Sequence, residues 1–334
     1  MRYNTAISGV RSGIAEQTYS ILADGTGRKS SKCEFSPLLD EKRITILLEL
    51  QKKGFLTISH IWRLCYRDKK RPAAEAGVRA LLQRGMVDRH RYFMGRGIGY
   101  LESFYFITRK GFNYLKNCEL PEFIEGGFRY KDAPMTIANY AHRKATLDFW
   151  ISLENSLPAD SSLDLVAFVP EWQPDDRGER IIMTVPQSEQ GRRLSLMPDA
   201  TFIVRSNRAT SEGRLQESLF FVEIDMDTEA ITGKRSLIDR FLKYQLAFSG
   251  LSFRHLGSYY ERFSGARLLF VANSTDRAAR VAETIVVNPA LSNAFLFTSL
   301  DEMVREGIFK GSFILSGKSS AVDINGQKIS HQNK

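Results

Sequence analysis

Three acidic residues lie beside two short apolar runs in the middle of the chain. Asp199 precedes the run Thr201 to Val204, and Glu223 and Asp225 end the run that begins at Leu219. Both runs are rich in β-branched and aromatic residues and are bounded by turn residues, which predicts two adjacent buried strands of one hairpin. Side chains alternate along a strand, so residues 223 and 225 share a face. The hairpin is therefore expected to bring the three carboxylates together.

Carboxylates that lie this close raise one another's pKa unless a positive charge lies between them. A hard divalent cation such as Mg²⁺ or Mn²⁺ commonly supplies that charge because it prefers oxygen ligands. Such a site can position a water molecule and stabilise the charge that develops on a phosphate. The three acids together indicate the chemistry of a metal-dependent nuclease, although any one acid at a strand end is as often a solvated turn residue.

These residues resemble a known family. Pro198-Asp199, followed by Glu223-Ile224-Asp225, looks like the PD-(D/E)xK core of restriction-endonuclease-like nucleases. The string from Phe221 to Glu229, with a helix carrying Lys243 and Tyr244 after it, resembles the replication-relaxation proteins of plasmids and related mobilisation relaxases. The resemblance covers residues 36 to 310 and implies a winged helix-turn-helix followed by a nuclease-like domain.

The resemblance also implies roles for particular residues. Asp199 and Glu223 would hold the metal, and Glu171, at the end of an earlier predicted strand, would join them. The family pattern has Lys where this chain has Asp225, so Lys234 or Lys243 would have to supply the ammonium that orients water or stabilises charge. The expected catalytic residues are Asp199, Glu223, Asp225, Lys234 and Lys243, with Mg²⁺ or Mn²⁺ as cofactor.

One histidine matches the same family. His142 lies on a helix predicted from Met135 to Leu153, and replication-relaxation proteins tend to carry a His in such a helix. A single His is more often structural than functional. Both interpretations of His142 stay open at this point.

The segment from residue 40 to residue 118 has the element order of a winged helix-turn-helix. Apolar stripes predict three helices, and two β-prone runs joined by a Gly-rich turn follow them. Thr108 is expected to cap a further helix. The predicted helices end at Gly54, span Ile58 to Tyr66 and span Pro72 to Gln83, and the β-prone runs are Met86 to Phe93 and Tyr100 to Ile107.

The positive charge of the chain is concentrated in this segment. The whole chain has a formal net charge of +9, and residues 40 to 118 contain 17 Lys and Arg against 7 Asp and Glu. A basic surface of this kind favours DNA as the partner, with the third helix in the major groove and the hairpin as the wing. The expected DNA-binding residues are Lys69, Lys70, Arg71, Glu75, Arg79, Arg89, Arg91 and Arg96.

Length and composition are those of a globular protein with two domains. The 334 residues are 43% hydrophobic and 25% charged, and no apolar run is long enough to span a membrane. We expect a cytoplasmic protein of the α/β (α+β) class. The predicted parts are a flexible arm (1–35), a winged helix-turn-helix domain (36–118), a linker (119–134), a restriction-endonuclease-like mixed-sheet domain (135–316) and a flexible tail (317–334).

Three functions fit this organisation. The first is a DNA-nicking, relaxase-like protein of a plasmid or mobile element, which acts in mobilisation, conjugation or replication together with other relaxosome or replication proteins. The second is a catalytically inactive accessory or replication-control protein that retains the nuclease fold and binds DNA. The third is a transcriptional regulator, which leaves the acidic motif unexplained.

Overall fold

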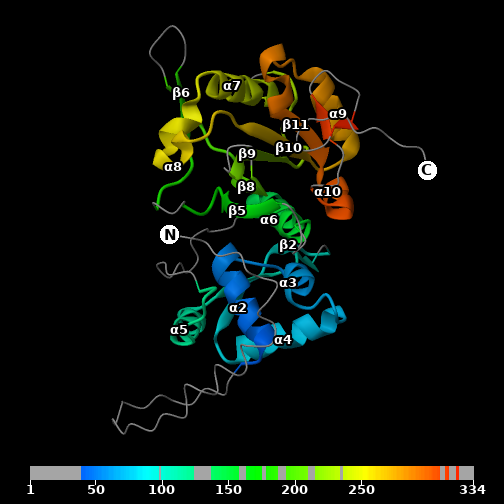
Figure 1. Cartoon of the computed structure of the whole chain (residues 1–334). Coiled ribbons are helices and arrows are strands. Elements are labelled where there is room, and N and C mark those ends of the chain that lie inside the picture. Colours follow the sequence, from blue (N-terminus) through cyan, green and yellow to red (C-terminus); the bar gives the residue numbers. More distant parts are fainter. Residues whose placement is uncertain are drawn as a thin grey trace, which may run out of the picture. The chain divides into compact units, whose positions relative to one another are not determined.

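The computed structural model describes residues 39–97, 99–123, 137–157, 163–174, 178–186, 193–209, 215–233, 236–308, 313–315 and 321–322. The chain forms two compact units that meet in sequence between Ile137 and Ala138 (Figure 1). The predicted arm lies outside the described residues, as do residues 124–134 of the predicted linker. The predicted α/β class is confirmed, because helices and a mixed sheet make up the described chain.

Three helices open the described part of the N-terminal unit. They are α2 (Glu41–Lys53), α3 (Ile58–Cys65) and α4 (Arg71–Gln83). The Asp40 side chain accepts from the backbone N–H of Arg43, and the Thr57 side chain accepts from that of His60, so each satisfies a donor that its helix leaves unpaired. Pro72 lies in the first turn of α4, where its missing N–H costs nothing. These local signals explain why the predicted helices and the observed ones nearly coincide.

Four short strands and one helix complete this unit. They are β1 (Val87–His90), β2 (Phe93–Gly95), β3 (Gly99–Tyr100), β4 (Phe104–Ile107) and α5 (Arg109–Asn117). β1 pairs with β4 and β2 pairs with β3, both antiparallel, so each predicted β-prone run is divided in two. The division follows from Tyr92, which is buried in the core between β1 and β2. We refer to β2, β3 and the turn between them as the β2–β3 hairpin.

A seven-stranded mixed sheet forms the centre of the C-terminal unit. Its strands, in spatial order, are β13 (Ala321–Val322), β12 (Phe313–Leu315), β11 (Phe295–Ser299), β10 (Arg267–Ala272), β9 (Leu215–Asp225), β8 (Ala200–Ala209) and β5 (Leu163–Pro170). The predicted hairpin of two buried strands is confirmed as β8 and β9, which pair antiparallel. β10 runs parallel to β9 and to β11, so the connections on either side of β10 cross the sheet.

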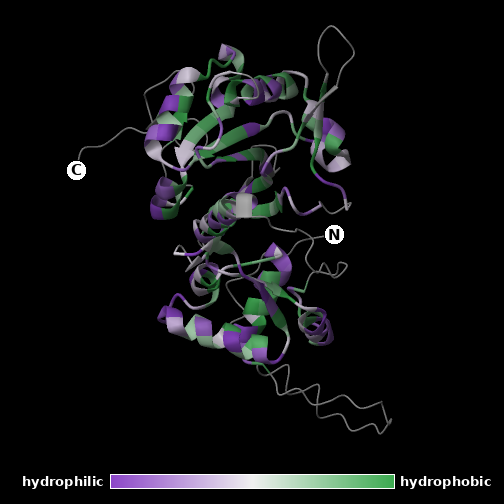
Figure 2. Cartoon of the chain, turned by 180° about the vertical axis from the view of Figure 1, so that it is seen from behind, coloured by the Kyte–Doolittle hydropathy of each residue, from purple (hydrophilic) through white to green (hydrophobic). Residues whose placement is uncertain are grey.

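Helices cover both faces of this sheet. One face packs against α6 (Ile137–Asn155) and α10 (Leu300–Glu306), and the other packs against α7 (Leu237–Ser249) and α9 (Thr275–Thr284). Shorter helices η1 (Ser252–Leu256), α8 (Ser258–Glu261) and η2 (Pro289–Ala294) connect these elements. Figure 2 shows hydrophobic residues along the central strands, as expected for a sheet buried on both sides. None of the helices in the described ranges is long and apolar enough to cross a lipid bilayer.

Two sequence predictions differ from the structure. Residues 180 to 185 read as a partner strand for β5, but β6 (Met183–Pro186) pairs instead with β7 (Arg193–Leu196), and β5 pairs with β8. The separate β6–β7 hairpin buries Met183 and Val185 in the core beside α7. An apolar sequence pattern shows that a strand is buried, but it does not show whether the strand belongs to the main sheet or to a separate hairpin. Within the predicted tail, β13 adds an edge strand to the sheet.

Candidate functional site

Asp199 and Glu223 lie at the end of the β8–β9 pair where β8 begins. The antiparallel register ends at the pair of Ala200 and Val222, so Asp199 and Glu223 lie just beyond the last pair. The backbone N–H of Asp199 donates to the carbonyl of Val222 over 3.0 Å, and its carboxylate Oδ2 accepts from the backbone N–H of Ile224 over 2.7 Å. The backbone and the side chain of Asp199 are therefore both hydrogen-bonded to β9.

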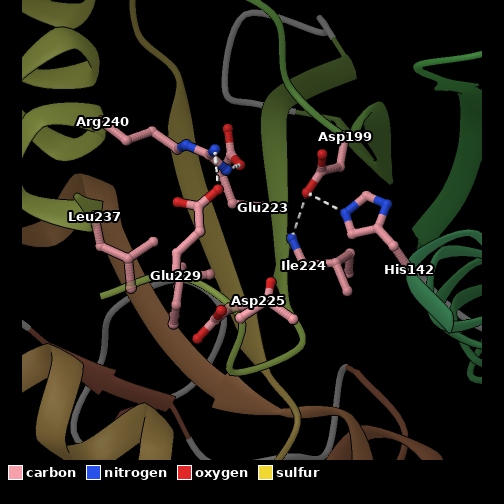
Figure 3. A pocket seen from close by; sticks show the side chains of 10 residues that line it. His142, Asp199, Glu223, Ile224, Asp225, Glu229, Leu237 and Arg240 are labelled. Atoms are coloured by element: carbon pink, nitrogen blue, oxygen red, sulfur yellow. Dashed lines mark hydrogen bonds and ion pairs between the residues drawn. The ribbon is translucent and has the colours of Figure 1, made fainter. Parts of the chain in front are cut away.

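The three predicted carboxylates line one pocket of about 180 Å³ (Figure 3). Asp199, Glu223 and Asp225 are each less than a tenth exposed, and Arg240 and His142 complete the polar wall. The strand alternation that placed residues 223 and 225 on one face is confirmed. Each of the three acids has its own cationic partner, and these partners come from three different helices.

Arg240 and Tyr244 of α7 hold the Glu223 carboxylate. Arg240 Nη1 donates to Glu223 Oε2 over 2.6 Å, and the Tyr244 hydroxyl donates to Oε1 over 2.6 Å. The two residues are four positions apart, so they share one face of α7. The second guanidinium nitrogen of Arg240 donates to Glu229 over 2.6 Å. Burial, and then the neighbouring Asp199 charge, raise the pKa of Glu223, while Arg240 and Tyr244 oppose that rise.

His142 of α6 is the partner of Asp199. Its Nε2 lies 3.1 Å from Asp199 Oδ2 (Figure 3). Burial alone would lower the pKa of His142, but the hydrogen bond and charge of Asp199 outweigh burial and raise the pKa to about 9. The imidazole is therefore a cation at neutral pH. This contact supports the functional interpretation of His142, because His142 binds the pocket acid Asp199 although the two residues are 57 positions apart in sequence.

Arg277 of α9 is the partner of Asp225. Its Nε lies 2.7 Å from Asp225 Oδ2 and 3.1 Å from Asp227 Oδ1, and its Nη2 donates to the backbone carbonyl of Glu229 over 2.6 Å. The Arg277 and Asp225 side chains are 6% and 4% exposed, so the pair is buried. Arg277 thus anchors the loop after β9 to α9, and Asp225 lines the pocket as part of that anchor.

The other predicted site residues lie elsewhere. The backbone N–H of Glu171 donates to the carbonyl of Asp199 over 2.8 Å, but the Glu171 side chain is 3.7 Å from Arg143 and does not line the pocket. Lys243 is half-buried on α7 and does not line the pocket either, and Lys234 lies outside the described residues.

Arg240 and Arg277 are site residues that the sequence analysis does not predict. The family pattern points to a lysine, whereas the cation at Glu223 is a guanidinium. A signal existed in the helical spacing, because Arg240 precedes Tyr244 by one turn and both follow the Glu223 strand.

The expected metal finds no matching set of ligands in the described part of the chain. No group of three His, Cys, Asp or Glu side chains there could hold a metal ion. Asp199 and Glu223 face the same pocket, but His142 and Arg240 already supply positive charge to them. The described residues therefore do not fit Mg²⁺ or Mn²⁺ held by three protein ligands. They form a network in which carboxylates alternate with organic cations.

The predicted DNA-binding residues are all exposed in the N-terminal unit. Arg71 at the start of α4 lies 3.0 Å from Glu102 and 3.4 Å from Glu75, so two acids share its charge. The set consists of Lys69, Lys70, Arg71, Glu75 and Arg79 in and before α4, Arg89 on β1, and Arg91 and Arg96 on either side of β2.

Comparison with known proteins gives one match. The replication-relaxation family model matches residues 47–253, more than half of the chain. The matched range contains His142, both strands of the β8–β9 pair and Arg240, and it ends before Arg277. No curated protein and no solved structure matches the chain.

Proposed function

This chain belongs to the replication-relaxation family, which associates it with replication or mobilisation, and we propose that it binds the double-stranded DNA of a plasmid or another mobile element. The N-terminal unit makes the contact. Helix α4 enters the major groove as the recognition helix of a winged helix-turn-helix, and the β2–β3 hairpin reaches the DNA backbone and minor groove as its wing.

The observation that carries this proposal is the exposure of the basic residues. Lys69 and Lys70 precede α4, Arg79 lies on it, and all three are exposed. Phosphate contacts by such side chains release bound counterions, and this release supplies most of the affinity of non-specific DNA binding. The segment from residue 40 to residue 118, with ten excess positive charges of which these residues carry a part, is suited to that role.

DNA affinity measured over a range of salt concentrations tests the proposal. Arg79→Ala should weaken binding and reduce the slope of log K against log salt by about one, the contribution of one phosphate contact. Arg305→Ala is the matched control, since Arg305 is an exposed arginine of the C-terminal unit whose side chain is 72% exposed. Equal slopes for Arg79→Ala and the unmodified protein would show that the DNA interface lies on another surface.

A second candidate function, phosphodiester cleavage, is supported by the pocket. Asp199 and Glu223 both line the pocket, and Arg240 donates a hydrogen bond to Glu223. Arg240 stays charged at every accessible pH, so it cannot take a proton but can stabilise negative charge on a phosphate. Glu223, whose pKa is raised, is a stronger base than an ordinary carboxylate and could accept a proton from an attacking water.

Incubation with supercoiled DNA tests cleavage. The protein would be mixed with supercoiled plasmid in Mg²⁺, in Mn²⁺ or in EDTA, beside Asp199→Ala and Glu223→Gln. Nicking that both substitutions abolish, with DNA affinity unchanged, would support a relaxase-like enzyme, and the EDTA arm decides whether a metal is needed. Binding without a nick would leave an accessory, replication-control or regulatory protein with an inactive nuclease-like pocket.

A further inference from the structure

The β2–β3 hairpin exposes two aromatic rings side by side. Phe93 and Tyr100 are partners in the antiparallel register, and their ring centroids lie 5.1 Å apart at an interplanar angle of 50°. Their exposed fractions are 50% and 64%, and the adjacent Met94 is 37% exposed. We call Phe93 and Tyr100 the aromatic pair.

The aromatic pair is separate from the core of its unit. Tyr92, next to Phe93 in sequence, is 2% exposed and packs edge-on against the fully buried Phe104, with ring centroids 6.0 Å apart. The chain thus turns one aromatic residue inward and its neighbour outward. Burial of a large aromatic side chain away from water contributes a large favourable free energy. The exposed aromatic pair is therefore suited to a partner that covers it.

Three exposed arginines lie close to the aromatic pair in sequence. Arg89 is on β1, Arg91 lies between β1 and β2, and Arg96 directly follows β2. The backbone at Gly95, Gly97 and Gly99 has φ of 112°, 88° and 86°, values that glycine adopts without strain. A hairpin that exposes an apolar pair near basic residues has the chemistry of a duplex-deforming wedge, in which cations hold the phosphates while an apolar side chain enters the base stack.

We propose that the aromatic pair is such a wedge, and that Phe93 inserts between two base pairs from the minor groove and kinks the bound duplex. The inference rests on the proposed DNA binding and adds a deformation to it. Tyr100 supports the Phe93 ring from the opposite strand, and Met94 adds apolar surface beside it. Insertion costs least at pyrimidine–purine steps, which unstack easily, so the wedge gives a preference for such steps without hydrogen bonds to bases.

The first test uses the unmodified protein and a base analogue. Duplexes of about 30 base pairs would carry a single TpA step in an otherwise GC-rich sequence, with 2-aminopurine in place of the adenine of that step. Insertion unstacks the analogue and increases its fluorescence when the protein binds. A duplex with the analogue away from any pyrimidine–purine step is the control and should show no increase.

The second test uses variants and the distance between dyes at the duplex ends. Phe93→Thr removes the ring and puts a β-branched residue, which favours strands, in its place, and Phe93→Trp keeps an aromatic ring. We expect the unmodified protein and Phe93→Trp to shorten the end-to-end distance, and Phe93→Thr to leave it as in free DNA. The slope of log K against log salt should be the same for all three, because phosphate contacts are unchanged. A thermal melt of each variant confirms that the unit is folded.

Specific outcomes overturn the inference. Bound DNA that stays straight and stacked with the unmodified protein would show that there is no wedge, even if DNA binding itself is established. Bending retained by Phe93→Thr, with a dimer of the unmodified protein turned into a monomer by that substitution in sedimentation, would make the aromatic pair an interface between copies of the chain. Absence of any DNA binding would remove the proposed function and the wedge together.

Discussion

Removal of one hydroxyl group should measure how much the pocket depends on the Glu223 carboxylate. Tyr244→Phe deletes the donor to Glu223 Oε1, a 2.6 Å hydrogen bond between a fully buried tyrosine and a carboxylate that is 2% exposed. The ring itself stays, so its contacts with Phe221 and Phe248 are kept. The change therefore isolates a single hydrogen bond to a charged group.

The magnitude follows from that geometry. A hydrogen bond to a charged group contributes about 1.5–3 kcal/mol to the free energy of unfolding. A unit of this size shifts its melting temperature by about 2–4 °C per kcal/mol, so the melting temperature of Tyr244→Phe should fall by about 3–12 °C. Because the hydroxyl favours the ionised carboxylate, the loss should be largest above the raised pKa of Glu223 and should diminish as acid protonates that residue.

The assay is thermal unfolding followed by circular dichroism in buffers from mildly acidic to alkaline pH. Tyr259→Phe is the matched control, since its ring keeps its place against Arg262 and the residue is only half-buried. The free energy lost with the Tyr259 hydroxyl should stay below about 1 kcal/mol. A melting temperature for Tyr244→Phe that equals that of the unmodified protein at every pH would refute the reasoning that this bond stabilises an ionised, buried Glu223.

Two further substitutions test the other ion pairs of the pocket. His142→Gln should make the free energy of unfolding less dependent on pH in the alkaline range. The pKa of His142 in the folded protein, about 9, lies above its ordinary value of 6.5. The stabilisation by His142 is therefore fully present below pH 6.5 and is lost as pH rises through 9. Denaturant unfolding as a function of pH checks this, and an unchanged curve would contradict it. Arg277→Leu leaves Asp225 buried without its cation and should lower the free energy of unfolding by about 3–5 kcal/mol. Arg280→Leu, at an exposed position of the same helix, should lower it by less than about 0.5 kcal/mol. Similar losses for both variants would show that the buried pair does not stabilise the fold.

Local features of the chain were predictable because their causes are local. The helices α2 and α3 follow from capping residues and apolar spacing, and α4 follows from apolar spacing with Pro72 in its first turn. The β8–β9 pair follows from two β-branched runs bounded by turns. The placement of the three pocket acids near one another needed only that hairpin and strand alternation. These predictions used interactions that extend over one or two adjacent elements.

The partners of the acids could not be predicted in the same way. Arg277 lies 52 residues after Asp225, and His142 lies 57 residues before Asp199, so only the packing of α9 and α6 on the sheet brings them into contact. Arg240 is closer in sequence, but it is an arginine, and the family pattern points to a lysine. The pairing of β6 with β7 likewise depends on which surface of the folded unit is available to bury Met183. Strand propensity carries no information about that tertiary packing.

Binding of the whole chain to duplex DNA across a salt series tests the central claim most directly. Seven of the eight predicted contact residues are cations, so log K should fall linearly with log salt with a negative slope no steeper than about −6. Alanine at Lys69, Lys70 and Arg79 together should make that slope shallower by about three. A slope near zero, or a triple variant that binds as the unmodified protein does, would contradict the claim that this basic surface binds DNA.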